Sequence, residues 1–233
     1  MPLPIKGLQK TSLLDYPDRL SCVVFVGGCN FRCPFCHNSE LVLNPDNIPN
    51  ISEDEVLAFL KSRKDWVEGV VITGGEPTIH RDLPAFIEKV KALGFAVKLD
   101  TNGTNNVMLR QLIKAKLLDY IAMDIKATPA KYAEAAGVAA NAGLIDIRES
   151  VQDIMNSGVK YEFRTTVIPK LHSEADILEL GQWLKGAERY ALQQFRPITP
   201  IDSGYKFESR YPQERLERFA DKLAPLIKRV EVR

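Results

Sequence analysis

The chain has 233 residues, of which 45% are apolar and 26% are charged, and these proportions are typical of one globular domain. Its net charge is +1, without a basic block or an acidic tail, so no strong field would draw it to nucleic acid or to an anionic membrane. The first ten residues hold no long apolar run like that of a secretory signal, and the apolar runs elsewhere are only as long as strands. We therefore expect no nucleic-acid or membrane partner, and a location in the reducing cytoplasm, where clustered cysteines bind metals more often than they form disulfides.

Six short runs rich in Val, Ile and Phe recur along the chain, and polar or glycine motifs and amphipathic helical patterns separate them. Continuous apolar runs of this length are typical of parallel strands that are buried on both faces. The six predicted strands are 21–26, 69–73, 96–101, 120–124, 161–167 and 190–195. Six βα units in succession predict an α/β fold with a mostly parallel sheet, either a barrel or a doubly wound sheet.

Start signals precede several of the predicted helices. Ser52 and Glu55 have the spacing of a capping box before an apolar-periodic stretch. Thr128 followed by Pro129 matches an N-cap with proline at the first helical position, and Ser173 opens a further helix. These signals, and the absence of a low-complexity linker, predict a single domain. Its parts are an N-terminal extension (1–20), a barrel core (21–200) and a C-terminal helix with a candidate final strand (201–233).

Each of four successive predicted strands is followed by a motif with cysteine, glycine or charged and polar side chains that could bind a ligand. Residues 29–36 follow the first strand, 74–76 the second, 100–103 the third and 124–126 the fourth. In a parallel sheet these points all lie at the carboxyl ends of the strands, where α/β proteins build their sites. We therefore expect the four motifs to lie along one edge of the sheet.

Three cysteines, Cys29, Cys33 and Cys36, have the spacing C-x3-C-x2-C. A loop of this length can wrap a compact iron–sulfur cluster and offer thiolates to three of its irons. Because no fourth cysteine lies close behind, one iron stays open to another ligand, and metal catalysis requires such an open position. Cys22 lies inside the first predicted strand, and we expect it to be a small buried side chain and not a ligand.

Other metal sites are alternatives for the same cysteines. Structural zinc would use the three cysteines with His37, but Cys36 and His37 are adjacent and poorly placed to hold one ion, and no second half of a zinc motif exists. An electron-transfer iron–sulfur protein is a separate alternative. It would not need the motifs at the other three strand ends.

The motifs after the second and fourth strands each have two interpretations. Gly74 and Gly75 permit a close backbone approach and Glu76 can pair with an ammonium group, although an ordinary turn has the same composition. Asp124 and Lys126 lie two apart on a strand and therefore share a face. They are either part of a site or a surface ion pair.

The residues of the remaining polar candidates likewise allow two interpretations each. Asp100, Thr101 and Asn102 offer a carboxylate, a hydroxyl and an amide around what is otherwise a plain Asn-Gly turn. Arg164, inside an apolar strand, needs an anion if it is buried, either a structural carboxylate or that of a ligand. Asp15, ahead of the first predicted strand, is a turn residue or a site residue.

The cysteine spacing with Phe35, His37 and Asn38 resembles the signature of the radical S-adenosylmethionine (SAM) activating enzymes. These include the activating enzymes of pyruvate formate-lyase and of the anaerobic ribonucleoside-triphosphate reductase, and the segment 7–17 is particularly similar to the second kind. The resemblance covers residues 7–197. It implies an incomplete (β/α)6 barrel whose three cysteines hold a [4Fe-4S] cluster. One electron from that cluster cleaves SAM to methionine and a 5′-deoxyadenosyl radical.

The resemblance also implies which residues surround SAM. Glu76 would bind the methionine amino group, residues 100–102 would serve the ribose, and Phe195 would lie near the adenine. Arg196 departs from the histidine that follows this strand in pyruvate formate-lyase activators. The implied cofactor-binding residues are Phe35, Gly74, Gly75, Glu76, Asp100, Thr101, Asn102, Asp124, Lys126, Arg164 and Phe195.

Further implications concern cations and partners. Asp100, Thr101 and Asp124 match positions that bind a monovalent cation in relatives, and Asp15 would face a substrate peptide. The sequence has no further cysteine cluster, which favours a large partner at the barrel mouth. By resemblance, that partner is a glycyl-radical enzyme, first of all the anaerobic ribonucleotide reductase, with flavodoxin or ferredoxin as the electron donor. The alternatives are a radical SAM enzyme acting on a small molecule or another peptide, and a non-enzymatic iron–sulfur or zinc module.

Overall fold

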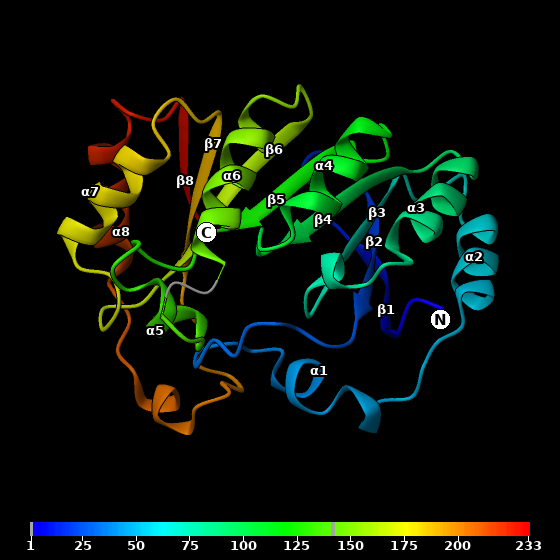
Figure 1. Ribbon diagram of the computed structural model, residues 1–233, viewed down its shortest axis with the longest axis horizontal. Coiled ribbons are helices and arrows are strands. Elements are labelled where there is room, and N and C mark those ends of the chain that lie inside the picture. The colour runs from blue at the N-terminus through cyan, green and yellow to red at the C-terminus, as the bar shows by residue number, and fades with distance from the viewer. Residues whose placement is uncertain (1, 141–142) are drawn as a thin grey trace. The chain divides into compact units, whose positions relative to one another are not determined.

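The computed structural model describes residues 2–140 and 143–233 (Figure 1). Residues 1, 141 and 142, which the predicted domain includes, lie outside the described residues. The strands form one sheet in the order β1-β2-β3-β4-β5-β6-β7-β8, and within the described residues it is not closed. A doubly wound sheet reverses its strand order partway, so a sheet in simple chain order excludes that alternative. The predicted α/β fold with a mostly parallel sheet is confirmed.

All six predicted strands are present, each within one residue of its predicted ends, and residues 229–232 form the expected final strand. The strands are β1 (Ile5–Ser12), β2 (Ser21–Val26), β3 (Gly69–Gly74), β4 (Ala96–Thr101), β5 (Tyr120–Asp124), β6 (Lys160–Val167), β7 (Arg189–Gln194) and β8 (Arg229–Val232). The prediction missed β1, which lies inside the expected N-terminal extension and pairs with β2 in antiparallel fashion. Only Ile5 and Ser12 of β1 are buried, so the strand has no apolar run that could mark it.

The helices are α1 (Ser39–Leu43), α2 (Glu53–Ser62), α3 (Leu83–Ala92), α4 (Asn106–Lys114), α5 (Tyr132–Ala136), α6 (Leu144–Met155), α7 (Glu174–Trp183) and α8 (Gln213–Leu223), with short 3-10 turns at Pro45–Asn47, Pro77–Ile79 and Ser203–Phe207. The capping box of Ser52 and Glu55 is confirmed, with the Glu55 amide donating to Ser52 Oγ at 3.2 Å. The predicted start at Thr128 and Pro129 is wrong. These residues form a turn in which the Lys131 amide donates to the Thr128 carbonyl, and α5 begins only at Tyr132. No helix among the described residues is long and apolar enough to cross a membrane.

Two compact units make up the chain. The first consists of Met1–Asn30, Glu40–Thr101 and Asn105–Ile121, and the second of Phe31–Ser39, Asn102–Thr104 and Ala122–Arg233.

In the first unit, β2, β3 and β4 pair in parallel. The register places Ser21 beside Gly69 at one end and Val26 beside Gly74 at the other. The segments after β2 and β3 therefore leave the sheet side by side. Strand residues such as Val24, Ile72 and Leu99 are fully buried, and burying a side chain of this size contributes about 1.5–3 kcal/mol.

In the second unit, β6, β7 and β8 pair in parallel, and α8 packs against α7, β7 and β8. The apolar stripe of α8 buries Leu216, Phe219 and Leu223. Gly181 of α7 leaves room for this packing, because a Cβ there would lie 2.3 Å from a Leu223 methyl group. This packing covers β7 and β8 of the second unit.

Candidate active site

The turn after β3 lies directly against the backbone that leads into the cysteine loop. The Glu76 amide donates to the Gly28 carbonyl at 2.9 Å. A Cβ on Gly75 would lie 1.8 Å from the same oxygen, and Gly74 has a φ of +114° that favours glycine. His80 Nε2 donates to the Gly27 carbonyl at 2.9 Å. The first role of the two glycines is therefore to let two backbones touch just ahead of Cys29.

The Glu76 carboxylate is buried and tightly held. Its Oε1 accepts hydrogen bonds from the Thr78 amide at 3.0 Å, from Thr78 Oγ1 at 2.6 Å and from Thr101 Oγ1 at 2.7 Å. The structure thus joins Glu76 and Thr101, two residues predicted to bind the same ligand. Three donors on one oxygen fix the orientation of a carboxylate, which suits it to pair with an ammonium group.

Asp100 has a buried partner that the sequence interpretation missed. Lys98, only 1% exposed, places its Nζ 2.5 Å from Asp100 Oδ1. The two residues lie two apart on β4 and so share a face, and this spacing was the signal that could have found the pair. At Asp100, one of the expected cation-binding positions, the chain itself supplies a positive charge.

Residues 102–104 form a compact turn in the second unit. Asn102 Oδ1 accepts from the Thr104 amide at 3.0 Å and from Thr104 Oγ1 at 2.7 Å, while the Gly103 carbonyl accepts from Ser150 Oγ of α6 at 2.8 Å. Gly103 has a φ of +75°. The Asn-Gly turn expected as the simpler interpretation is present, and Asn102 stabilises it.

The second unit holds residues 31–39 of the cysteine loop from two sides. On one side, the Arg32 amide donates to the Ala136 carbonyl at 2.9 Å, and a Cβ on Gly137 would lie 2.1 Å from the Arg32 carbonyl oxygen. On the other side, the Asp202 amide donates to the Pro34 carbonyl at 2.9 Å. The loop conformation is therefore set by contacts distant in sequence.

An aromatic cluster lies beside the third cysteine. The rings of Phe35 and Phe195, both predicted to contact the cofactor, each pack on Tyr205, with centroids 6.2 Å and 6.4 Å apart. All three side chains are buried. Tyr205 was missed because it lies in a polar segment after the last predicted βα unit.

All four cysteines are thiols, and they differ in environment. Cys22 is fully buried, and burial raises its pKa to about 12, which suits the inert role predicted for it. In residues 2–140 and 143–233, no three His, Cys, Asp or Glu side chains are gathered closely enough to hold a metal ion as they stand. The donor set of Cys29, Cys33 and Cys36, three thiols on one short loop, nevertheless has the chemistry that iron–sulfur clusters require.

Asp124, Lys126 and Arg164 form a half-buried ion triad. Arg164 Nε lies 2.7 Å from Asp124 Oδ1, and Lys126 Nζ lies 3.0 Å from Asp124 Oδ2. Burial opposes the charge on Asp124, but Arg164 and Lys126 outweigh it and hold the Asp124 pKa well below its usual range. Burial likewise opposes the charge on Lys126, while Asp124 and then Cys33 outweigh it and raise the Lys126 pKa. Two cations against one carboxylate leave the triad net positive, which favours an anionic ligand.

His172, which the sequence gave no reason to place in a site, contacts the backbone of Lys126. Its Nδ1 accepts from the Ile168 amide at 3.0 Å and its Nε2 donates to the Lys126 carbonyl at 2.8 Å, so the ring is a neutral tautomer. The side chain is fully buried, and this burial lowers its pKa. A protonated ring would lose the bond from Ile168.

We expect the free energy of unfolding to fall as the pH drops below about 6.5, the ordinary histidine value. The pKa of His172 is lowered in the folded state, so the unfolded chain binds the proton more readily and acid favours unfolding. His37 and His80 have lowered pKa values too and act in the same direction. Urea unfolding of the wild type and of His172→Gln across pH 5–8 is the measurement. An unchanged pH slope in a folded His172→Gln would contradict this role.

Asp15 lies in the turn between β1 and β2, and Ser12 Oγ donates to its Oδ2. Ser12 pairs with Ser21 at the amino end of β2, whereas Cys29 follows the carboxyl end of that strand. Because β1, which was not predicted, runs antiparallel to β2, the turn that carries Asp15 lies at the amino end of β2. That Asp15 faces a substrate peptide stays a prediction.

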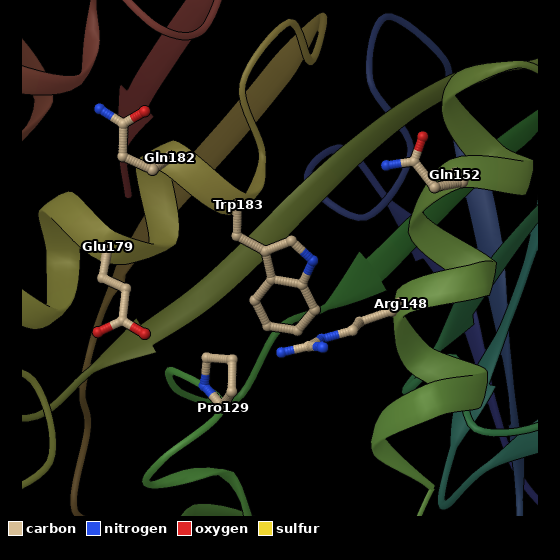
Figure 2. Close-up of a pocket in the computed structure, with 6 residues that line it drawn as sticks. All are labelled: Pro129, Arg148, Gln152, Glu179, Gln182 and Trp183. Carbon is tan, nitrogen blue, oxygen red and sulfur yellow. The ribbon is translucent and has the colours of Figure 1, made fainter.

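A cavity of about 510 Å³ lies on the second unit (Figure 2). Helices α6 and α7 and the turn before α5 line it with Pro129, Arg148, Gln152, Glu179, Gln182 and Trp183. Figure 2 shows the Arg148 side chain extending toward the Trp183 ring. None of the predicted site residues lines this cavity.

Comparisons with known proteins agree with the arrangement of motifs. A family model described as the radical SAM superfamily matches residues 23–184. A protein of Methanocaldococcus jannaschii, provisionally named a glycyl-radical enzyme activating enzyme, is 35% identical over 217 residues, covering 87% of this chain and 84% of that relative. A GTP 3′,8-cyclase of Helicobacter pylori is 30% identical over 159 residues, covering 67% of this chain but only 49% of the cyclase.

Among solved structures, SuiB of Streptococcus suis bound to S-adenosylmethionine matches with a TM-score of 0.66 at 18% identity. The match covers 88% of this chain and 48% of SuiB, and at this identity it bears on the fold alone. The family match spans the cysteine loop and the motifs after β3, β4 and β5. The chain therefore belongs to the radical SAM superfamily, whose enzymes use a [4Fe-4S] cluster and SAM.

Proposed function

We propose that this radical SAM enzyme activates a glycyl-radical enzyme by removing a hydrogen from a glycine Cα of that partner. The carrying observation is the 35% identity, over 84% of its length, to the Methanocaldococcus relative that bears this provisional name. The proposed partner is the anaerobic ribonucleotide reductase, on the likeness of segment 7–17. The proposed setting is an anaerobic cytoplasm with flavodoxin or ferredoxin as the donor.

The proposal assigns the cluster to Cys29, Cys33 and Cys36. When bound, the cluster supplies the single electron that cleaves SAM. The chain's own contribution is to anchor the backbone next to the cysteines. The Gly28 and Arg32 backbones on either side of Cys29 are each fixed by contacts from distant segments.

Two charged groups, one in each compact unit, have charges that match groups of SAM. Glu76, buried and oriented by Thr78 and Thr101, is suited to pair with the amino group. Lys126 and Arg164 make the Asp124 triad net positive and so suit the carboxylate.

The aromatic cluster suits the adenine. Phe35, Phe195 and Tyr205 offer a buried apolar wall onto which a flat base can pack, and such a wall keeps water from a reactive carbon radical. Glycine suits the role of substrate because it lacks a Cβ and its Cα can approach closely.

The test is to mix reduced enzyme, SAM and the anaerobic ribonucleotide reductase of the same organism without oxygen. We expect an electron paramagnetic resonance doublet, because a glycyl radical keeps one α-hydrogen, together with 5′-deoxyadenosine. A Cys33→Ala enzyme should give neither signal. SAM cleavage without a doublet on any glycyl-radical enzyme of that organism would contradict the activase proposal.

A second candidate is a radical SAM enzyme acting on a small molecule. The identity to the GTP 3′,8-cyclase over 67% of this chain favours it. Consumption of GTP that depends on SAM and on the reduced enzyme, in the absence of any protein partner, is the result that would favour this candidate over the activase.

A further inference from the structure

Lys98 is a lysine in the core of the first unit. It is 1% exposed, and its neighbours on β4, Val97 and Leu99, are fully buried, as is Val71, which lies beside it on β3. Lysine is almost never buried to this extent unless its charge is paired. Since taking an ammonium group out of water is costly, the charge must be balanced from within the protein.

The ion-pair partner of Lys98 is Asp100. Lys98 Nζ lies 2.5 Å from Asp100 Oδ1, and the two side chains share a face of β4 because they lie two residues apart. The Lys98 side chain is 2% exposed, whereas that of Asp100 is 14% exposed. The ammonium therefore approaches the carboxylate from the buried side, while part of Asp100 stays accessible from outside.

The two carboxylates expected to bind a monovalent cation do not fit one. In the first unit, Asp100 Oδ1 already has the Lys98 ammonium at ion-pair distance. In the second unit, Arg164 and Lys126 contact the two carboxylate oxygens of Asp124 at 2.7 Å and 3.0 Å. A dissolved cation at either carboxylate would lie beside a side-chain cation, and like charges at such short range repel. Each carboxylate therefore takes its positive charge from the chain itself.

We propose that the Lys98 ammonium is a built-in substitute for a monovalent cation at Asp100, so that this enzyme binds SAM without dissolved K⁺ or Na⁺. The ammonium balances the charge of Asp100 and holds its Oδ1 in place. A carboxylate held in this way is oriented to accept hydrogen bonds from the ribose hydroxyls of SAM, the role that the resemblance implies for it. Lys98 is thus a positioning residue, since it acts on SAM through Asp100. The inference rests on the SAM that the superfamily uses, and it does not depend on the glycyl-radical partner.

The test measures the dissociation constant of SAM on the reconstituted enzyme in KCl, in NaCl and in tetramethylammonium chloride at equal ionic strength. Tetramethylammonium is too bulky to approach a recessed carboxylate closely. For the wild type we expect the same dissociation constant in all three salts. Lys98→Ala removes the ammonium and leaves space beside Asp100 that a small cation can enter. We expect it to bind SAM about tenfold more weakly than the wild type in tetramethylammonium chloride, and to recover in KCl or NaCl.

A second measurement follows the thermal unfolding of the cluster-free protein in the same salts, so it requires neither SAM nor a cluster. A cation that binds only the folded chain raises its unfolding temperature. K⁺ and Na⁺ should therefore stabilise Lys98→Ala relative to tetramethylammonium, and they should give the wild type no such advantage.

Two further variants serve as controls. Lys98→Met fills the same space without a charge, so it should bind SAM about tenfold more weakly than the wild type in every salt. Lys91→Ala removes another ion-paired lysine of the first unit, whose Nζ lies 2.6 Å from Asp119 Oδ2. This variant should bind SAM as the wild type does in every salt.

A wild type that needs K⁺ or Na⁺ to bind SAM would overturn the proposal. So would an equal loss of affinity by Lys98→Ala in all three salts, because the ion pair would then only support the fold. If the alanine variant does not fold, wild-type SAM affinity in Lys98→Met overturns the proposal instead. None of these results bears on the glycyl-radical partner, whose test is the doublet.

Discussion

Alanine in place of Cys29, Cys33 or Cys36 is expected to abolish the bound four-iron cluster after anaerobic reconstitution, and with it all cleavage of SAM. With three thiolates a cluster keeps one iron open, whereas two thiolates leave two irons without protein ligands. The loop itself should survive the change, because the Gly28 and Arg32 backbones anchor it without using a thiol. Iron and sulfide content and the charge-transfer absorption of the cluster are the measurements.

Cys22→Ala is the matched control for these three variants. Cys22 is fully buried in β2, and its raised pKa keeps it protonated at neutral pH. We expect this variant to hold a full cluster and to cleave SAM at the wild-type rate. Loss of the cluster in a folded Cys22→Ala protein would refute the ligand assignment.

Glu76→Gln is expected to weaken SAM binding about tenfold to a hundredfold while leaving the cluster assembled. A charge-assisted hydrogen bond contributes roughly 1.5–3 kcal/mol, which corresponds to that loss of affinity. Glutamine keeps a carbonyl oxygen that can still accept from Thr78 and Thr101, so the turn after β3 should hold its shape. The measurement is the dissociation constant of SAM on the reconstituted enzyme.

Glu174→Gln serves as the control, because Glu174 pairs with Arg215 and Lys222 near the surface of α7 and touches no residue of the proposed site. It should bind SAM as the wild type does. If Glu76→Gln also binds SAM with unchanged affinity, the Gly-Gly-Glu turn does not bind SAM. The turn then has only the structural role of contacting the Gly28 backbone.

Several parts of the site became evident only from contacts in the tertiary structure. Lys98 reads in the sequence as an interruption of an apolar strand, and only its burial against Asp100 gives it a role. Tyr132 and Tyr205 lie in segments without clear periodicity, and their neighbours Phe31 and Phe35 are far away along the chain. His172 acquired a function once its ring was found against the Lys126 carbonyl.

The sequence by itself determined the six central strands and the motif after each of the first four. Continuous apolar runs and closely spaced functional groups are local properties, and parallel pairing then orders the strand ends. Only the tertiary structure decided that β1 is a strand, that α5 starts at Tyr132, and that Asp15 lies at the amino end of β2. The physical reason is that an edge strand, a helix start and a turn are stabilised by distant segments that pair with them or pack on them. Their own residues carry little of that free energy.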